Sequence, residues 1–424
     1  MIGFVIPILS FLFVLIFVYL NELNLGIFRQ SIIDYSSKLN KVSSYSLMSG
    51  MFLFISLYIL ALRHVEIHTK LGKTISLFQN WYPKDIPFTD ARILSDSIWC
   101  FRKYDLFKVN PCFNFYWNYP TTFKYMPLWM SNPIIFEIIT IFAYTFIIFS
   151  IIQISKMRAN PVFLLVVFSP SFLFGVERGN FEGVILILIS IASYYFALIV
   201  KDRALKKNQI VYFYRMGLVV VTTIAAVSIK FYPIVMFLFF AILSPKKYQK
   251  IVFLCNFLIM LLLSYKILDL AKFISNAPSP HTSSLGLNSL FYSIFKADFF
   301  LVVLFITVSI FSFNKFKLLF VRFYESGQKI ENNIQTTCGL PPFLLLMAVW
   351  LIGGNTLYRA ILILPALGLM TFSDRIVKIT MFSTLWFSAF PIFENFLMLL
   401  LLTLGIGYTS RHLKDRASVI SRNL

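Results

Sequence analysis

Long apolar runs, separated by short and mostly basic segments, dominate the chain. A helix needs about 20 apolar residues to cross the hydrocarbon core of a bilayer, so each run predicts a membrane span. We predict thirteen spans, several of them short enough for broken or tilted helices. They are residues 2–20, 46–62, 133–154, 161–176, 183–200, 210–229, 232–244, 251–268, 296–313, 342–353, 358–372, 379–392 and 396–409. The predicted fold class is all-α, a polytopic membrane helical bundle forming a single membrane domain over residues 1–424.

The longest interruption between spans, residues 63–132, predicts a structured loop rather than a tether, because it is rich in aromatic side chains. Segment 89–107 within it predicts a short amphipathic helix. Such a helix would lie flat at the membrane interface. The side chains expected along its apolar side are Ile93, Leu94, Ile98 and Trp99.

Composition and charge agree with a membrane protein. Hydrophobic residues make up 58% of the chain, charged residues 13%, and mean hydropathy is +0.79, whereas soluble domains are about a quarter charged. The net charge of +20 would suggest nucleic acid in a soluble protein, but no RNA-binding motif or basic-aromatic platform accompanies it. We therefore expect no nucleic-acid partner, and assign the charge to contact with anionic membrane lipids.

The basic residues also predict an orientation. In the thirteen-span topology every short Lys/Arg cluster falls on one side, which should be cytoplasmic. Loop 63–132 and half of the acidic residues fall on the outer side, together with the N-terminus. The first run, 2–20, has no basic segment before it and no small-residue cleavage site, so we interpret it as a retained span.

Cysteine and histidine positions give one candidate disulfide and no metal site. Cys100 and Cys112 both fall in the outer loop, where an oxidising compartment allows them to pair. Two free thiols remain the alternative, and the disulfide is favoured. Cys255 falls inside a span and Cys338 in a predicted cytoplasmic loop. The histidines form no ligand constellation, so we expect no metal, and no cofactor is indicated.

Residues 176–183, Val-Glu-Arg-Gly-Asn-Phe-Glu-Gly, place two carboxylates and an arginine between two apolar runs. Ionisable groups are costly inside a bilayer, so such groups are functional candidates. Glu177, Arg178, Asn180 and Glu182 would form a polar site if they face a protein cavity at the membrane surface.

Other polar segments are predicted on the same outer side. Thr89-Asp90-Ala91-Arg92 opens the amphipathic segment, and Lys230 and Arg359 fall at later outer turns. One face thus offers a candidate base and several cations near the level of the lipid headgroups. This combination suits an anionic lipid substrate and chemistry on a hydroxyl group.

The outer segments also carry a resemblance. Phe88-Thr89-Asp90-Ala91-Arg92, Tyr104-Asp105-Leu106-Phe107, Asn110-Pro111-Cys112 and Asn118-Tyr119-Pro120 resemble the outer loop of bacterial polytopic glycosyltransferases. These belong to the GT-C superfamily, in the branch of polyprenyl-phosphate-mannose-dependent mannosyltransferases and their uncharacterised relatives. Ser169-Pro170 through Glu177-Arg178-Gly179-Asn180, with Lys230 and Pro233, is similar too, and the likeness covers roughly residues 80–300.

The resemblance implies a multi-pass protein of the bacterial inner membrane with an outward-facing active site. It implies transfer of a sugar from a polyprenyl phosphate to an envelope hydroxyl, on a glycolipid, a polysaccharide or a protein, with inversion. Asp90 matches the catalytic base of the family. We expect Arg178, Lys230 and Arg359 to bind the phosphate, and Glu177, Asn180 and Glu182 to orient the sugar or Arg178. The outer motifs add three substrate-binding candidates, Arg92, Asn118 and Tyr119.

Each assignment has a structural alternative. Asp90 could cap the helix that it opens, and Glu177–Arg178 could be a structural ion pair. Lys230 and Arg359 could extend toward the interface from span ends. Asn118-Tyr119-Pro120 could be a turn with its tyrosine in the interfacial aromatic belt.

Three other functions compete with the glycosyltransferase. A polymerase of lipid-linked repeat units would also have a large outer loop, but would rely on arginines rather than an Asp base. A lipid or solute transporter predicts an internal repeat and broken helices meeting at the midplane, and the sequence shows no clear repeat. A purely structural subunit gives no reason for so many charges on one face.

Overall fold

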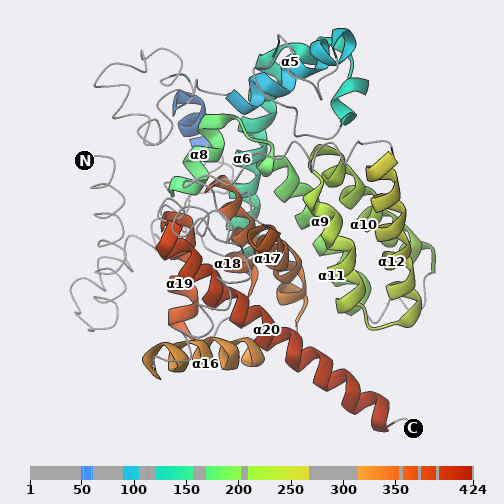
Figure 1. The fold of residues 1–424 in the computed structure, drawn as a ribbon, viewed down its shortest axis with the longest axis vertical. Helices are drawn as coiled ribbons and strands as arrows, with labels where there is room; N and C mark the ends of the chain where they lie inside the picture. The colour runs from blue at the N-terminus through green and yellow to red at the C-terminus, as the bar shows by residue number, and fades with distance from the viewer. Residues whose placement is uncertain are drawn as a thin grey trace. The chain divides into compact units, whose positions relative to one another are not determined.

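The structure is a computed structural model of the chain, shown in Figure 1. It describes residues 49–60 without 51 and 59, 89–104, 112, 121–155, 169–201, 209–266, 314–331, 333–352, 357–370, 374–387 and 391–422. The predicted spans 2–20 and 296–313 lie outside these ranges, as does the first half of 161–176.

All regular structure in the described residues is helical, which confirms the predicted all-α class. Four helices are long and apolar enough to cross a membrane: Glu182–Val200, Gln209–Ile229, Lys247–Tyr265 and Ile334–Leu351. Three of them coincide closely with predicted spans. Shorter apolar helices occur at Pro133–Ile147, Tyr232–Leu243, Ile376–Leu385 and Phe396–Arg411.

The chain divides into two compact units. Unit 1 contains residues 1–189, 221–234 and 255–277, and unit 2 contains residues 190–220, 235–254 and 278–424. Helices α9 (Glu182–Lys201), α10 (Gln209–Ile229) and α12 (Lys247–Lys266) contribute residues to both.

Helix α5 (Thr89–Lys103) is the predicted amphipathic helix, and it packs within unit 1. Leu94 and Ile98 are fully buried, and the neighbours of α5 are the 3-10 helices η1 (Thr121–Tyr125) and η2 (Leu128–Ser131) and helix α6 (Pro133–Ser155). The grouping of Trp99 with these side chains was wrong, because Trp99 is 43% exposed. Successive residues of a helix point about 100° apart, which separates Trp99 from Ile98.

Helix α8 (Pro170–Arg178) begins with a cap that its sequence predicts. The Ser169 hydroxyl accepts the backbone N–H of Phe172, and Pro170 fills the first helical position. Gly179 ends the helix in the left-handed conformation, with φ 63°. The backbone N–H groups of Gly179 and Asn180 return to the carbonyls of Val176 and Gly175, each at 3.0 Å, and complete the turn.

The ring of Tyr144, from α6, lies against the backbone of the α8–α9 turn. A Cβ placed on Gly175 would collide with the Tyr144 hydroxyl. A Cβ on Gly183 would lie 2.9 Å from a Tyr144 ring carbon. Tyr144 also contacts Phe172 edge-on, at 5.1 Å between ring centroids. The two glycines therefore let α6 approach this turn closely.

Beyond α10, the predicted span 232–244 forms η5 (Tyr232–Val235) followed by α11 (Met236–Leu243). The aromatic rings of Phe196, Phe240 and Phe253 pack together in unit 2, with centroids 4.6–5.8 Å apart. All three rings are fully buried.

Helices α16 (Asn314–Lys329) and α20 (Pro391–Arg422) cross at close range in unit 2, as Figure 1 shows. A Cβ on Gly327 would collide with the Leu404 carbonyl, and one on Gly407 with the Tyr324 carbonyl. Small residues on both helices thus allow backbone-to-backbone contact.

The predicted span 342–353 is longer than expected, since α17 covers Ile334–Ile352 and continues through Pro341 and Pro342. Cys338, predicted in a loop, is a buried residue of this helix. Segment 358–372 is not one helix: it forms η6 (Leu357–Ile363) and the short α18 (Leu364–Leu369). Helix α19 (Arg375–Phe387) precedes α20.

Candidate functional site

The polar residues of the 176–183 segment meet Asp90 and Lys230 in unit 1. Arg178 ends α8, Asn180 lies in the turn, and Glu182 begins α9. Asp90 lies in the first turn of α5, and Lys230 directly follows α10. We call these five residues, Asp90, Arg178, Asn180, Glu182 and Lys230, the charged network.

Both oxygens of the Asp90 carboxylate accept hydrogen bonds from the α8–α9 turn. Arg178 donates to Oδ1 from a terminal nitrogen at 2.7 Å and from Nε at 3.2 Å. Asn180 Nδ2 donates to Oδ2. Asp90 is 4% exposed and Arg178 is partly buried. The hydrogen bonds of the Asp90 carboxylate go to Arg178 and Asn180 rather than to the first amides of α5. Asp90 therefore connects α5 to the turn that precedes α9.

A second buried ion pair joins the ends of two membrane-length helices. Lys230 Nζ lies 2.8 Å from Glu182 Oε1, and the Tyr232 hydroxyl donates to Oε2 of the same carboxylate. The Glu182 side chain is fully buried and that of Lys230 is 8% exposed. Because Glu182 begins α9 and Lys230 follows α10, the contact brings the near ends of both helices together.

Asn180 bridges the two ion pairs. Its Oδ1 accepts the backbone N–H of Glu182 at 2.9 Å and Lys230 Nζ at 3.4 Å, while its Nδ2 donates to Asp90. The bond to the amide two residues ahead is an Asx-turn, for which asparagine is well suited. Since the oxygen meets only donors and the nitrogen an acceptor, these partners fix the orientation of the amide.

The electrostatics keep Asp90 ionised. Burial raises the pKa of the Asp90 carboxyl, but the charge and hydrogen bonds of Arg178, the Asn180 amide and the charge of Lys230 outweigh this and lower the pKa below its ordinary value. Asp90 is therefore a carboxylate at neutral pH, and a weak base while Arg178 holds it.

The remaining predicted residues are not among the five residues of this network, and two of them lie outside the described ranges. Glu177 is buried and accepts a hydrogen bond from the Tyr58 hydroxyl at 3.4 Å. Arg92 lies half-buried on α5, and Arg359 lies half-buried on η6 in unit 2. Asn118 and Tyr119 lie outside the described residues.

Two tyrosines of the site were not predicted. Tyr232 follows Lys230 by two residues, and its hydroxyl completes the partners of Glu182. Tyr58 belongs to the apolar run 46–62 and reaches Glu177. A tyrosine in such a run normally indicates packing or an interfacial position, so its contact with Glu177 could not be predicted from the sequence.

No family model matches the chain, and neither does any curated protein or solved structure.

Cys100 and Cys112 are joined in the structure by a disulfide, with Cα atoms 6.4 Å apart, as predicted. Cys100 lies on α5 and Cys112 follows it in the chain. The bond holds Cys112 beside the helix that carries Asp90 in its first turn. Among the described residues, no group of three or more His, Cys, Asp or Glu side chains is placed to hold a metal ion.

Proposed function

We propose that the protein is a multi-pass membrane glycosyltransferase that moves a sugar from a polyprenyl phosphate to an envelope hydroxyl, at the outer face of the membrane. One observation carries the proposal: a buried aspartate is held by an arginine and an asparagine at the turn that leads into a membrane-length helix. The resemblance of the segments around Asp90 and Arg178 to GT-C enzymes, in the polyprenyl-phosphate-mannose-dependent branch, supports it.

The proposed reaction requires a general base for the acceptor hydroxyl and a cation for the leaving phosphate. The acceptor hydroxyl gives its proton to Asp90 and forms a bond to the anomeric carbon, while the bond from that carbon to the phosphate oxygen breaks and the phosphate leaves with the electron pair. A positioned general base is worth about 10²–10⁴-fold in rate. The negative charge that builds on the leaving phosphate requires a cation, and Arg178 suits it because a guanidinium binds phosphate with two parallel hydrogen bonds.

The Asp90–Arg178 pair suggests how the base is activated. The donor phosphate would compete with Asp90 for Arg178, whose side chain is the more exposed partner, 19% against 6%. Once Arg178 turns to the phosphate, Asp90 loses the charge that lowers its pKa, while its burial remains. The pKa of Asp90 then rises, which makes it a better base at the moment the donor is bound.

Sugar transfer in reconstituted vesicles tests the proposal. The vesicles receive a panel of polyprenyl-phosphate sugars and extracted envelope lipids, with wild type beside Asp90→Asn and Arg178→Lys. Asp90→Asn should abolish transfer, and Arg178→Lys should lower it because a lysine keeps the charge but loses the paired hydrogen bonds. Glu325→Gln, an exposed acid of α16, is the matched control and should leave transfer unchanged.

The outcome also separates the competing functions. Transfer that survives Asp90→Asn in a normally folded protein would remove Asp90 from catalysis and favour a polymerase that relies on arginines. Movement of lipid or solute across the vesicle membrane without transfer would favour a transporter. Because Asp90 also joins α5 to α9, its variants need a thermal unfolding measurement beside each activity.

A further inference from the structure

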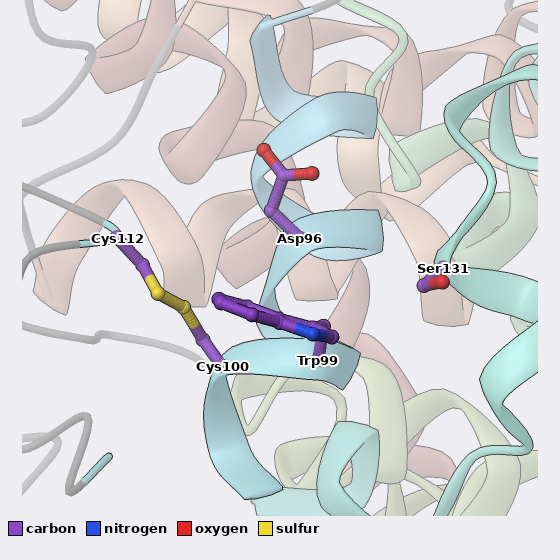
Figure 2. A pocket seen from close by; sticks show the side chains of 5 residues that line it. All are labelled: Asp96, Trp99, Cys100, Cys112 and Ser131. Carbon is purple, nitrogen blue, oxygen red and sulfur yellow. A yellow bond between two sulfur atoms is a disulfide. The ribbon is translucent and has the colours of Figure 1, made fainter. Parts of the chain in front are cut away.

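A pocket of about 350 Å³ lies beside α5, away from the charged network. Its lining is Asp96, Trp99, Cys100, Cys112 and Ser131, and Figure 2 shows these side chains around it. Asp96 and Trp99 follow Asp90 by six and nine residues on one helix, which places them about 9 and 14 Å further along its axis. The pocket is therefore a separate feature of unit 1.

The walls of this pocket are held in place by the fold. The Cys100–Cys112 disulfide forms one wall and fixes the loop residue against α5. Ser131 ends η2, which packs against both α5 and α6. The next residue, Asn132, accepts the backbone N–H of Ile134 at 3.1 Å and so anchors η2 to the start of α6. A pocket with fixed walls is typical of ligand sites, which are largely preformed.

Trp99 gives the pocket an aromatic wall. Lys103 Nζ lies 4.3 Å from the centre of the Trp99 ring. Lys103 follows Trp99 by one turn and Asp96 precedes it by about one turn on the same helix. Trp99 and Asp96 both line the pocket, and Figure 2 shows the two side chains side by side along α5.

The charges around the pocket select against ionic ligands. Asp96 repels anions. Lys103 already lies over the Trp99 ring, and the positive charge of Arg92 acts on Asp96, so a cation gains little from either group. Burial raises the pKa of Asp96 against the hydrogen bond of Ser95 and the charge of Arg92, which is the effect of partial removal from water. A partly desolvated carboxylate accepts strong hydrogen bonds from neutral hydroxyl groups.

We propose that this pocket binds a neutral hexopyranose ring of a glycan. The C–H face of the sugar would stack on Trp99, because polarised C–H groups favour the electron-rich face of an aromatic ring. The sugar hydroxyls would donate to Asp96 and exchange a hydrogen bond with Ser131. The volume lies at the small end of ligand pockets, about 300–1,000 Å³, which suits a short saccharide. The proposal goes beyond the transfer reaction and does not depend on it.

The test measures sugar binding to the full chain in phospholipid nanodiscs, which avoids detergents with sugar headgroups. Saturation-transfer NMR follows four neutral disaccharides in turn: maltose, lactose, mannobiose and chitobiose. We expect at least one to bind, with at least tenfold weaker binding in Trp99→Ala and Asp96→Asn. Trp99→Phe should keep part of the binding, because a smaller aromatic face remains.

Trp129→Ala is the matched control, since Trp129 is 66% exposed on η2 and does not line the pocket. Its binding should equal that of the wild type. Binding by none of the four sugars, or binding that Trp99→Ala leaves unchanged, would overturn the proposal. Asp90→Asn should retain sugar binding, so a failure of the transfer proposal and a failure of this one give different results.

Discussion

The Lys230–Glu182 pair makes a quantitative prediction about stability. Removing one partner leaves the charge of the other buried and unpaired, because the Glu182 side chain is fully buried and that of Lys230 is 8% exposed. At the 2.8 Å separation of Nζ and Oε1, the attraction is about 6 kcal/mol at an effective dielectric constant of about 20, before desolvation is subtracted. Breaking a buried pair from one side costs about 3–5 kcal/mol.

We therefore expect Lys230→Met and Glu182→Gln each to lower the free energy of unfolding by about 3–5 kcal/mol. The double variant should lose much less than the sum, because it leaves no unpaired buried charge. A coupling energy of about 2–3 kcal/mol is the expected difference, at the upper end for directly contacting residues. The assay is reversible unfolding in mixed micelles of increasing dodecyl sulfate content, followed by circular dichroism.

The Arg322–Asp374 pair of unit 2 is the matched control. Its Nη2–Oδ1 distance is 3.0 Å, but the Arg322 side chain is 53% exposed. Exposed pairs contribute about 0–1 kcal/mol, so the same cycle with Arg322→Met and Asp374→Asn should give a coupling energy in that range. Additivity within about 0.5 kcal/mol at Lys230 and Glu182 would show that the two charges do not stabilise one another, and would refute the reasoning.

Two further predictions concern the turn and the exposed pair. In thermal unfolding, Gly183→Ala should destabilise the protein by about 1–3 kcal/mol through the clash with Tyr144. Adding Tyr144→Leu should restore part of this stability. Gly217→Ala is the control, since its Cβ meets nothing within 4 Å, and it should be neutral or stabilising. Burial raises the pKa of Asp374, but hydrogen bonds from Arg322 and Ile376 lower it below its ordinary value. The stability that Asp374 contributes is thus present above about pH 4 and lost as pH falls through the lowered pKa. The difference in stability between Asp374→Asn and wild type at pH 7 should therefore shrink as the pH of unfolding titrations is lowered below about 4.

The helices that sequence pattern located best are those with long uninterrupted apolar runs. The predicted span 183–200 corresponds to α9 (Glu182–Lys201), and 210–229 to α10 (Gln209–Ile229). Length and hydropathy suffice there, because no proline interrupts either run and Arg215 is the single charged residue within them. The helical class followed from the same signal.

The helix boundaries that were predicted wrongly are those where tertiary packing outweighs the local conformational preference of the residues. The predicted span 342–353 begins at Pro342, and proline disfavours a helix interior. Helix α17 nonetheless continues through both Pro341 and Pro342, and most of its apolar window is buried inside the protein. Neighbouring elements can compensate for the missing backbone donors in such helices. The grouping of Trp99 failed for a different reason, since helix geometry alone separates it from Ile98 by about 100°.

The candidate site shows the limit of a single sequence most clearly. Segment 176–183 stood out because its charges interrupt apolar runs, and that signal located Arg178, Asn180 and Glu182. Their partners could not be inferred, because Asp90 lies 88 residues before Arg178 and Lys230 lies 48 residues after Glu182. An ion pair of Arg178 with its neighbour Glu177 was one alternative, and the structure shows Arg178 donating two hydrogen bonds to Asp90.

The position of the charged network along its helices favours surface chemistry over transport. Helix α9 has 20 residues and α10 has 21, so each extends about 30 Å, the thickness of a hydrocarbon core. If both helices span, Glu182 at the start of α9 and Lys230 just after α10 fall together at one membrane surface. A transporter instead places its polar site near the midplane, between unwound helices. In the proposed function, the buried carboxylate and the arginine would then meet a lipid-linked phosphate at the level of its headgroup, where the proposed transfer takes place.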